Sequence, residues 1–181
     1  MGPDANDSLA ALVATDPAAA VAALADRYAP DCYRLAYRLV QDHHTAQDCV
    51  QNAFVRVASR IDTWRGAGSL RAWLMRITTN EACRLAVSGR RVLPTAPDPA
   101  LAAEEAPDPV EGRERADAVR RALLALPPGQ RDVLTLRHYA QLPLADIAAE
   151  RGCAVGTVKA TLFQAYAALR RLLPDGLQPE D

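Results

Sequence analysis

The sequence predicts an all-α protein made of two small helical domains joined by an acidic, proline-rich linker. Its 181 residues are 50% hydrophobic but only 5% aromatic, and the abundant Ala, Leu and Arg are good helix formers. Apolar residues recur at helical spacing in both halves of the chain. Residues 93–112 contain five of the 13 prolines and several acids but no base, which disfavours a packed core. We therefore predict domains over 1–92 and 113–181, with a flexible linker over 93–112.

The first domain is expected to hold four helices. The first of them is interrupted at Asp16-Pro17, where a second short helix can begin. In the third, an apolar stripe lies opposite a polar face, and Thr45 with Asp48 resembles a capping box. Ser69 follows two glycines and is a plausible N-cap for the fourth. The predicted ranges are 9–25, 31–40, 45–61 and 70–88.

The second domain is also expected to hold four helices, and its last two read as a helix-turn-helix over 143–173. Ala148 is small where two helices approach, Gly152 gives the turn its backbone freedom, and Val158 packs the second helix on the first. A helical hairpin that serves only for packing is the alternative. The predicted ranges are 114–126, 130–139, 143–151 and 155–173.

In a helix-turn-helix, the second helix enters the major groove with its N-terminal residues toward the base edges. Here Lys159 suits a phosphate or a guanine, Gln164 can pair with adenine, and Phe163 can contact a thymine methyl. Three arginines, Arg151, Arg170 and Arg171, would contact phosphates, and a solvated polar face is the alternative for each. The predicted duplex-contacting residues are Arg151, Thr157, Lys159, Ala160, Thr161, Phe163, Gln164 and Arg170.

The helix expected over 70–88 carries a second candidate surface, because its polar residues at every fourth position share one face. Cations beside an aromatic ring and an amide suit single-stranded nucleic acid, through phosphate attraction, base stacking and base-edge hydrogen bonds. Trp64 can be a stacking platform or a core residue, and Trp73 is expected in the core. The predicted single-strand-contacting residues are Trp64, Arg65, Arg71, Arg76, Asn80 and Arg84.

The charge pattern is compatible with nucleic-acid partners although the formal net charge is only −1. Residues 31–92 and 119–173 each carry a net charge of +5, and the segments before, between and after them are acidic. Charge per module bears on binding partners more directly than the total does. We expect the acidic segments to restrain DNA binding by the free chain.

Other classes of protein are not indicated. The chain has no run of 18 apolar residues, and its acidic start lacks the basic region of a signal peptide, so a cytoplasmic protein without a membrane segment is expected. No enzyme motif is present, and no cofactor, metal or small-molecule substrate is predicted. The four cysteines are expected to be small buried residues. The alternatives are redox sensing and a zinc site at Cys32, Cys49 and the His43-His44 pair, which is otherwise expected in an exposed loop.

Two sets of motifs resemble conserved domains of the extracytoplasmic-function (ECF) sigma factors of the sigma-70 family. The motifs RYAP (27–30), YRLA (33–36), TAQDCVQNAF (45–54), WRG (64–66) and LRAWLMRITTN (70–80) resemble the second domain. The motifs LPPGQRDVL (126–134), DIA (146–148), VGTVK (155–159) and ALR (168–170) resemble the fourth domain. The two sets occur in the right order, and together they are more specific than either alone.

The resemblance implies a protein that binds core RNA polymerase and directs it to promoters. The loop 62–69, including Ser69, and the helix 70–84 with Asn80 would hold the melted non-template strand of the minus-ten element, with a base flipped out. The helix from Val155 would read the minus-thirty-five element, and its domain would also contact the flap of the β subunit. The residues implied to dock on the clamp helices of the β′ subunit are Asp48, Gln51, Asn52 and Val55.

Two further expectations follow from the same resemblance. The acidic linker would thread toward the polymerase active-site cleft, and an anti-sigma factor would be a partner. The sequence departs from the family pattern at Asn52, where Glu is common, and at Arg84, where Asp is common. Family members also often have Ser, Arg and Arg at Ala160, Thr161 and Gln164, and the loss of such phosphate contacts lowers salt sensitivity.

Three rival hypotheses remain from the residues. One is a helix-turn-helix regulator that works without polymerase. Another is a sigma-like protein-interaction module that reads DNA weakly, as the missing arginines of the last helix suggest. A metal enzyme is the third and is the furthest from the pattern.

Overall fold

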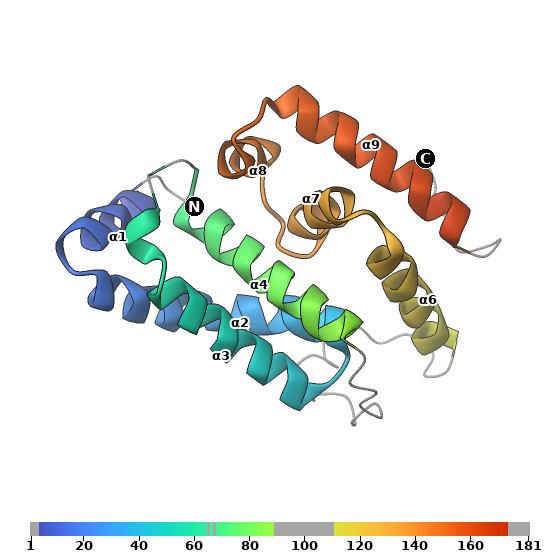
Figure 1. Cartoon of the computed structure of the whole chain (residues 1–181), viewed down its shortest axis with the longest axis horizontal. Coiled ribbons are helices and arrows are strands. Elements are labelled where there is room, and N and C mark those ends of the chain that lie inside the picture. Colours follow the sequence, from blue (N-terminus) through green and yellow to red (C-terminus); the bar gives the residue numbers. More distant parts are fainter. Residues whose placement is uncertain (1–3, 65, 67, 89–110, 174–181) are drawn as a thin grey trace.

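A computed structural model describes residues 4–64, 66, 68–88 and 111–173, without the side chains of residues 4–8 and 111–113. These residues form two groups of helices, and no strand occurs among them (Figure 1). The first group comprises α1 (Asp4–Thr15), α2 (Pro17–Val40), α3 (His43–Ala58), the 3-10 turn Ile61–Thr63 and α4 (Leu70–Val87). The second comprises α6 (Glu111–Ala125), α7 (Pro128–His138), α8 (Leu144–Arg151) and α9 (Val155–Leu172). The predicted all-α class is confirmed, and nearly all of the predicted linker lies outside the described residues.

α2 is one continuous helix where the sequence suggested two. Its N-cap is Asp16, whose carboxylate accepts the N–H of Ala19 at 3.0 Å, so the predicted break before Pro17 is confirmed. The gap expected between residues 25 and 31 is wrong, because the helix continues through Pro30. Pro30 cannot bond to the carbonyl of Asp26, but both residues are exposed, and water can satisfy that carbonyl.

α3 begins two residues before the predicted start, and a different residue caps it. The Asp42 carboxylate accepts both the backbone N–H and the hydroxyl of Thr45 at 2.7 Å. Thr45 is therefore a donor to the cap, and the predicted capping box is wrong. The His pair lies in the first turn of α3 rather than in a loop. The His43 Nδ1 atom lies 2.7 Å from the Tyr33 hydroxyl, and His44 is exposed.

The core of the first group lies between α2, α3 and α4. The apolar stripe of α3 is buried against the other two helices, as its period predicts. Its buried members are Ala46, Cys49, Ala53 and Val57. Ser69 caps α4, as predicted, by accepting the N–H of Ala72 at 3.1 Å. Trp73 is half-buried and packs against this core.

The second group contains the predicted helix-turn-helix. α8 ends at Gly152, whose φ of +63° lies in the left-handed region that glycine adopts without strain. The N–H of Cys153 then donates to the Ala148 carbonyl at 3.0 Å and closes the turn. The buried residues of α9 are Val158, Leu162, Ala165 and Leu169, as predicted. Leu172 was expected to continue this stripe but is exposed, and Leu173 takes the buried position.

The two groups share one hydrophobic core, a feature that the sequence did not predict. α4 packs on α2 and α3 on one side and on α7 and α8 on the other (Figure 1). Arg71 of α4 donates to the Ala140 carbonyl at 2.9 Å. The guanidinium of Arg38 in α2 lies 5.8 Å from the centre of the Tyr139 ring, a cation–π contact between the groups.

Candidate nucleic-acid interface

The polar face of α3 is open to solvent. Asp48, Gln51 and Asn52 are exposed, as the stripe on the opposite face predicts. Val55 extends this face by one turn and is 67% exposed, which is unusual for a large apolar residue on a packed helix. These four residues form a continuous surface that a protein partner can reach.

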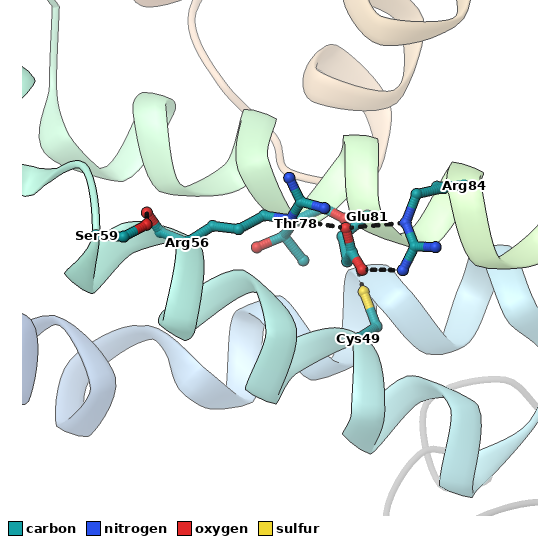
Figure 2. Close-up of polar contacts among 6 residues, drawn as sticks. All are labelled: Cys49, Arg56, Ser59, Thr78, Glu81 and Arg84. Atoms are coloured by element: carbon teal, nitrogen blue, oxygen red, sulfur yellow. Dashed lines mark hydrogen bonds and ion pairs between the residues drawn. The ribbon is translucent and has the colours of Figure 1, made fainter.

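A buried carboxylate organises the polar cluster between α3 and α4 (Figure 2). The side chain of Glu81 is only 3% exposed, yet it forms ion pairs with two arginines. Its Oε2 atom accepts from Nε of Arg56 at 3.1 Å and from Nε of Arg84 at 3.3 Å, and its Oε1 accepts from Nη2 of Arg84. Hydrogen bonding to Arg84 is the main cause that lowers the pKa of Glu81, against the opposing effect of burial. Glu81 is therefore ionised at neutral pH and holds two guanidinium groups at this surface.

A cavity of about 150 Å³ opens beside this cluster. Its lining consists of Arg56, Arg60, Ile77, Asn80, Glu81 and Arg84. Three guanidinium groups face one carboxylate, so the cavity carries a net positive charge. Arginine binds phosphate through paired N–H donors, and the exposed amide of Asn80 can hydrogen-bond to a base edge. The arrangement suits a nucleotide of a single strand.

Arg56, Arg60 and Glu81 were not among the residues predicted from the sequence. A signal for each was present, because the two arginines are four residues apart and Glu81 precedes Arg84 by three, both spacings of neighbours on a helix. The contact between α3 and α4 that brings them together was not in the sequence pattern. Arg84 departs from the family pattern, and the structure gives it a role, because Glu81, one helical turn earlier, forms an ion pair with it.

The predicted single-strand residues are divided between several places. Asn80 and Arg84 line the cavity. Trp64 is half-buried against the core, and its indole Nε1 is buried without a hydrogen-bond partner among the described residues. Arg65 lies outside the described residues.

The two other members of that set, Arg71 and Arg76, together with Ser69, contact the second group of helices. The Ser69 hydroxyl donates to Oδ2 of Asp146 in α8 at 3.2 Å. Arg76 Nη1 forms an ion pair with Oε1 of Glu150, also in α8, at 2.8 Å. Arg71 contacts the second group through the carbonyl bond given above. The structure thus places these polar groups at the junction between the two groups of helices.

The N-terminal half of α9 presents the predicted duplex-contacting residues to solvent. Those exposed are Thr157, Lys159, Ala160, Phe163 and Gln164. Phe163 is 76% exposed. The Thr161 hydroxyl donates to the Thr157 carbonyl at 2.9 Å, so it is bonded within its own helix. This face combines an apolar ring, an amide and one cation, which suits contacts to base edges and methyl groups more than attraction to phosphates.

Of the three arginines predicted to contact phosphates, Arg171 is exposed, and the other two are partly buried. The side chain of Arg151 is 25% exposed and lies 3.9 Å from Oδ2 of Asp132 in α7. Arg170 is half-buried. Burial is the main cause that raises the pKa of Asp132, and the nearby cations Arg151, Arg131 and Arg76 act in the opposite direction. Arg151 is therefore engaged within the chain.

The cysteines are packed as apolar residues. Cys32, Cys49 and Cys83 are buried, and Cys153 is half-buried. Burial raises the pKa to about 11 for Cys32 and Cys83 and to about 12 for Cys49, so these groups remain thiols at neutral pH. Within the described residues, no three His, Cys, Asp or Glu side chains gather as a metal site. The zinc alternative therefore has no support from the geometry.

The fold defines an all-α protein that combines a helix-turn-helix, a motif typical of DNA-binding proteins, with a separate arginine-lined cavity between α3 and α4. Within the described part of the chain, no helix has the length and apolar character needed to cross a membrane.

Comparison with known proteins gives the family. Residues 24–92 match the family model for Sigma-70 region 2, and residues 116–169 match the model for Sigma-70, region 4. The RNA polymerase sigma-H factor of Pseudomonas aeruginosa is 34% identical, over 77% of this chain and 78% of that protein. The ECF RNA polymerase sigma factor SigW of Bacillus subtilis is 30% identical, over 86% of this chain and 90% of that protein.

A solved structure agrees with these matches. The sigma factor RpoE in complex with the anti-sigma factor NepR, from Bartonella quintana, is 25% identical and aligns with a TM-score of 0.52. The alignment covers 82% of this chain and 92% of that one. The chain belongs to the extracytoplasmic-function group of the sigma-70 family. It is an RNA polymerase sigma factor. The alternative of a transcriptional regulator that works without polymerase is not favoured. The sigma factors are not known as a family of enzymes.

Proposed function

We propose that this sigma factor acts in the cytoplasm by binding rather than by catalysis, and that three separate surfaces guide core RNA polymerase to a promoter. The observation that supports this best is that one chain combines an exposed reading face on α9 with a cationic cavity that contains Asn80. One surface suits duplex DNA and the other suits a melted strand. We also propose the domain limits 1–92 and 113–181 with a linker over 93–112.

The first surface is the open face of α3, which we assign to core polymerase. Asp48, Gln51 and Asn52 supply polar contacts, and Val55 supplies an apolar one at the end of the face. Burial of an exposed apolar residue inside a polar rim is a common source of binding energy at protein interfaces. The proposed partner of this face is the clamp-helix pair of the β′ subunit.

The second surface is the cavity between α3 and α4, which we assign to the non-template strand of the minus-ten element. The guanidinium groups of Arg56, Arg60 and Arg84 would neutralise its phosphates, and Asn80 would read a base. We assign the remaining predicted single-strand residues to the same surface, namely Trp64, Arg65, Ser69, Arg71 and Arg76.

The third surface is the exposed face of α9, which we assign to the minus-thirty-five element. Lys159 is its one cation in the first turns, while Phe163 and Gln164 suit a thymine methyl and an adenine. Weak attraction to phosphates would leave this contact dependent on the polymerase, which raises the effective concentration of the domain at the promoter. The same domain would contact the β flap.

A protein partner that blocks these surfaces is also proposed. One solved structure with a similar fold is of a sigma factor bound to an anti-sigma factor. An anti-sigma factor for this chain would compete with core polymerase or promoter DNA.

The test uses the full chain with core RNA polymerase and a promoter template in a run-off transcription assay. Lys159→Ala is expected to weaken binding of the upstream duplex and to lower its salt slope by about one phosphate contact. Asn80→Ala is expected to leave duplex binding intact but to impair promoter opening. The controls are Arg121→Ala in α6 and Ser88→Ala at the C-cap of α4, two exposed positions outside the proposed surfaces. Unchanged promoter-dependent transcription in both test variants would refute the site assignment.

A further inference from the structure

We propose that α8 is an intramolecular competitor of the minus-ten strand: its carboxylates at Asp146 and Glu150 occupy strand-binding groups of the first helical group in the free chain. This inference rests on the proposed function of that surface and names how the same surface is regulated.

The contacts place acids where phosphates are expected. Asp146 accepts from the Ser69 hydroxyl at 3.2 Å, and Glu150 pairs with Arg76 at 2.8 Å. The two acids are four residues apart, so they lie on one face of α8. Ser69 is also the N-cap of α4, and the N-terminus of a helix favours a negative group, whether a carboxylate or a phosphate. α8 therefore offers this surface the same chemistry that a DNA backbone offers.

The approach is too close for a strand to lie between the two elements. Gly68 precedes Ser69, and a Cβ atom built on it would lie 3.2 Å from the Glu150 backbone nitrogen and 3.4 Å from the Ala149 Cβ. The backbone of the proposed strand-binding loop thus touches the backbone of α8. The side chain of Arg76 is 40% exposed, but a strand can take the places of Asp146 at the Ser69 hydroxyl and of Glu150 at Nη1 of Arg76 only after α8 has moved away.

The contact is also incomplete, which allows it to be displaced. The Glu150 side chain is 3% exposed, and its Oε2 atom is buried without a hydrogen-bond partner among the described residues. A buried carboxylate oxygen without a partner costs free energy, so the closed arrangement is held less firmly than its ion pair suggests. Binding energy from polymerase or DNA can then open it.

The closed arrangement covers only part of the proposed machinery. The α3 face for core polymerase and the α9 face for the duplex are exposed in it. Core polymerase can therefore bind first and the strand-binding surface can be released later. Acidic segments were expected to restrain DNA binding, but most of them lie outside the described residues. The acids that contact the surface here belong to α8.

The first experiment measures single-strand binding by the free full-length chain. The probe is a fluorescein-labelled, single-stranded DNA 20-mer of random sequence, followed by anisotropy. The double variant Asp146→Asn with Glu150→Gln keeps the side-chain shapes and removes both charges. We expect it to bind about tenfold more tightly than the wild type, because more of the chain is open. The control, Glu114→Gln with Asp117→Asn, removes the same charge from α6 and is expected to bind as the wild type does.

The second experiment locks the arrangement with a disulfide. A Cβ built on Gly68 would lie 3.4 Å from the Ala149 Cβ, close to the separation in a disulfide, although the φ of +76° at Gly68 strains any residue that carries a Cβ. Gly68→Cys with Ala149→Cys is made in a Cys153→Ser background, which removes the only described cysteine that is not buried. We expect the bridge to form under mild oxidation, the oxidised chain to lose at least tenfold in affinity for the 20-mer, and reductant to restore it.

Two outcomes would overturn the proposal. One is a bridge that forms readily but leaves the affinity for the 20-mer unchanged. The other is no bridge together with equal affinity of the wild type and the Asp146→Asn, Glu150→Gln variant. Failure of the proposed function has a different signature, since the wild type would then drive no promoter-specific run-off with core polymerase. If run-off transcription is normal and one of the two overturning outcomes is observed, only the proposed role of α8 is rejected, and the proposed function stands.

Discussion

Glu81 and Asp132 are two poorly exposed carboxylates whose surroundings shift their pKa values in opposite directions. Glu81 is bonded by two arginines, and its pKa is lowered mainly by the hydrogen bonds from Arg84. Asp132 has cations nearby, but burial dominates and raises its pKa. A carboxyl with a lowered pKa stabilises the folded state when ionised, and one with a raised pKa destabilises it when ionised.

Glu81→Gln is expected to lower the free energy of unfolding by about 1–2 kcal/mol at neutral pH, because two charged hydrogen-bonding partners lose their acceptor. The figure is modest because the side chains of Arg56 and Arg84 are 46% and 54% exposed. Urea unfolding measures it, with Glu114→Gln as the control. The lowered pKa means that this stability is present above the usual carboxyl range and is lost as pH falls through the lowered pKa. A penalty that stays constant as pH falls would contradict this account of Glu81.

Asp132→Asn is expected to behave in the opposite way. The folded chain binds the Asp132 proton more strongly than the unfolded chain, so ionisation costs stability above the raised pKa, and this cost disappears as pH falls through it. At neutral pH the variant should be at least as stable as the wild type, and its advantage should vanish in acid. Parallel urea titrations at several pH values measure this. A clear loss of stability at neutral pH would show that the pair with Arg151 outweighs burial.

At the scale of elements, the ends of the helices are set by single side chains rather than by periodicity. The stripe of α3 fixes which face is buried, but its first turn depends on Asp42, which binds both donors of Thr45. The C-terminal end of α8 in the helix-turn-helix is set in a different way, by the left-handed backbone of Gly152. These local features position the α3 face and the α9 face, which carry two of the three proposed contacts.

The cap of α3 can be tested directly against the capping box that the sequence suggests. Asp42→Ala is expected to cost about 1 kcal/mol of stability, because the first turn of α3 loses its acceptor. Asp48→Ala should change stability little, since Asp48 is exposed and does not cap the helix. Thermal unfolding followed by circular dichroism compares the two. A larger loss of stability for Asp48→Ala than for Asp42→Ala would contradict this assignment and support the capping box of Thr45 and Asp48.

For the whole molecule, the shared core implies that the two groups of helices support each other. α4 lies between them, and its buried face is covered from both sides (Figure 1). The polar contacts of α8 with Ser69 and Arg76 lie at the edge of this junction. Their loss should loosen this junction.

This coupling predicts the course of unfolding. Both tryptophans, Trp64 and Trp73, belong to the first group, so their fluorescence reports that group alone, while far-ultraviolet circular dichroism reports both. In the wild type the two probes should give the same urea midpoint, as coupled units do. In the Asp146→Asn, Glu150→Gln variant the midpoints should separate. Separate midpoints already in the wild type would show that the groups unfold independently.

How much the sequence predicted depends on how local the cause was. The helical stripes, the Ser69 cap, the turn at Gly152 and the exposed face of α9 follow from residues close to one another in the chain, and they are as predicted. The continuity of α2 through Pro30 was missed because solvent exposure decided it, and the Asp42 cap was missed because the Asp42 carboxylate is a competing acceptor. The cavity at Glu81 and the packing of α8 on α4 join residues far apart in sequence, and no pattern in one chain encodes such contacts.

The central claim is that this chain gives core RNA polymerase a choice of promoter. The most direct measurement adds the purified chain to core polymerase and genomic DNA of its host and maps the transcription start sites. The account predicts starts at a limited set of positions, each preceded by the same pair of short sequence elements. It also predicts that scrambling either element abolishes the corresponding transcript. Start sites that do not change when the chain is left out would contradict the account.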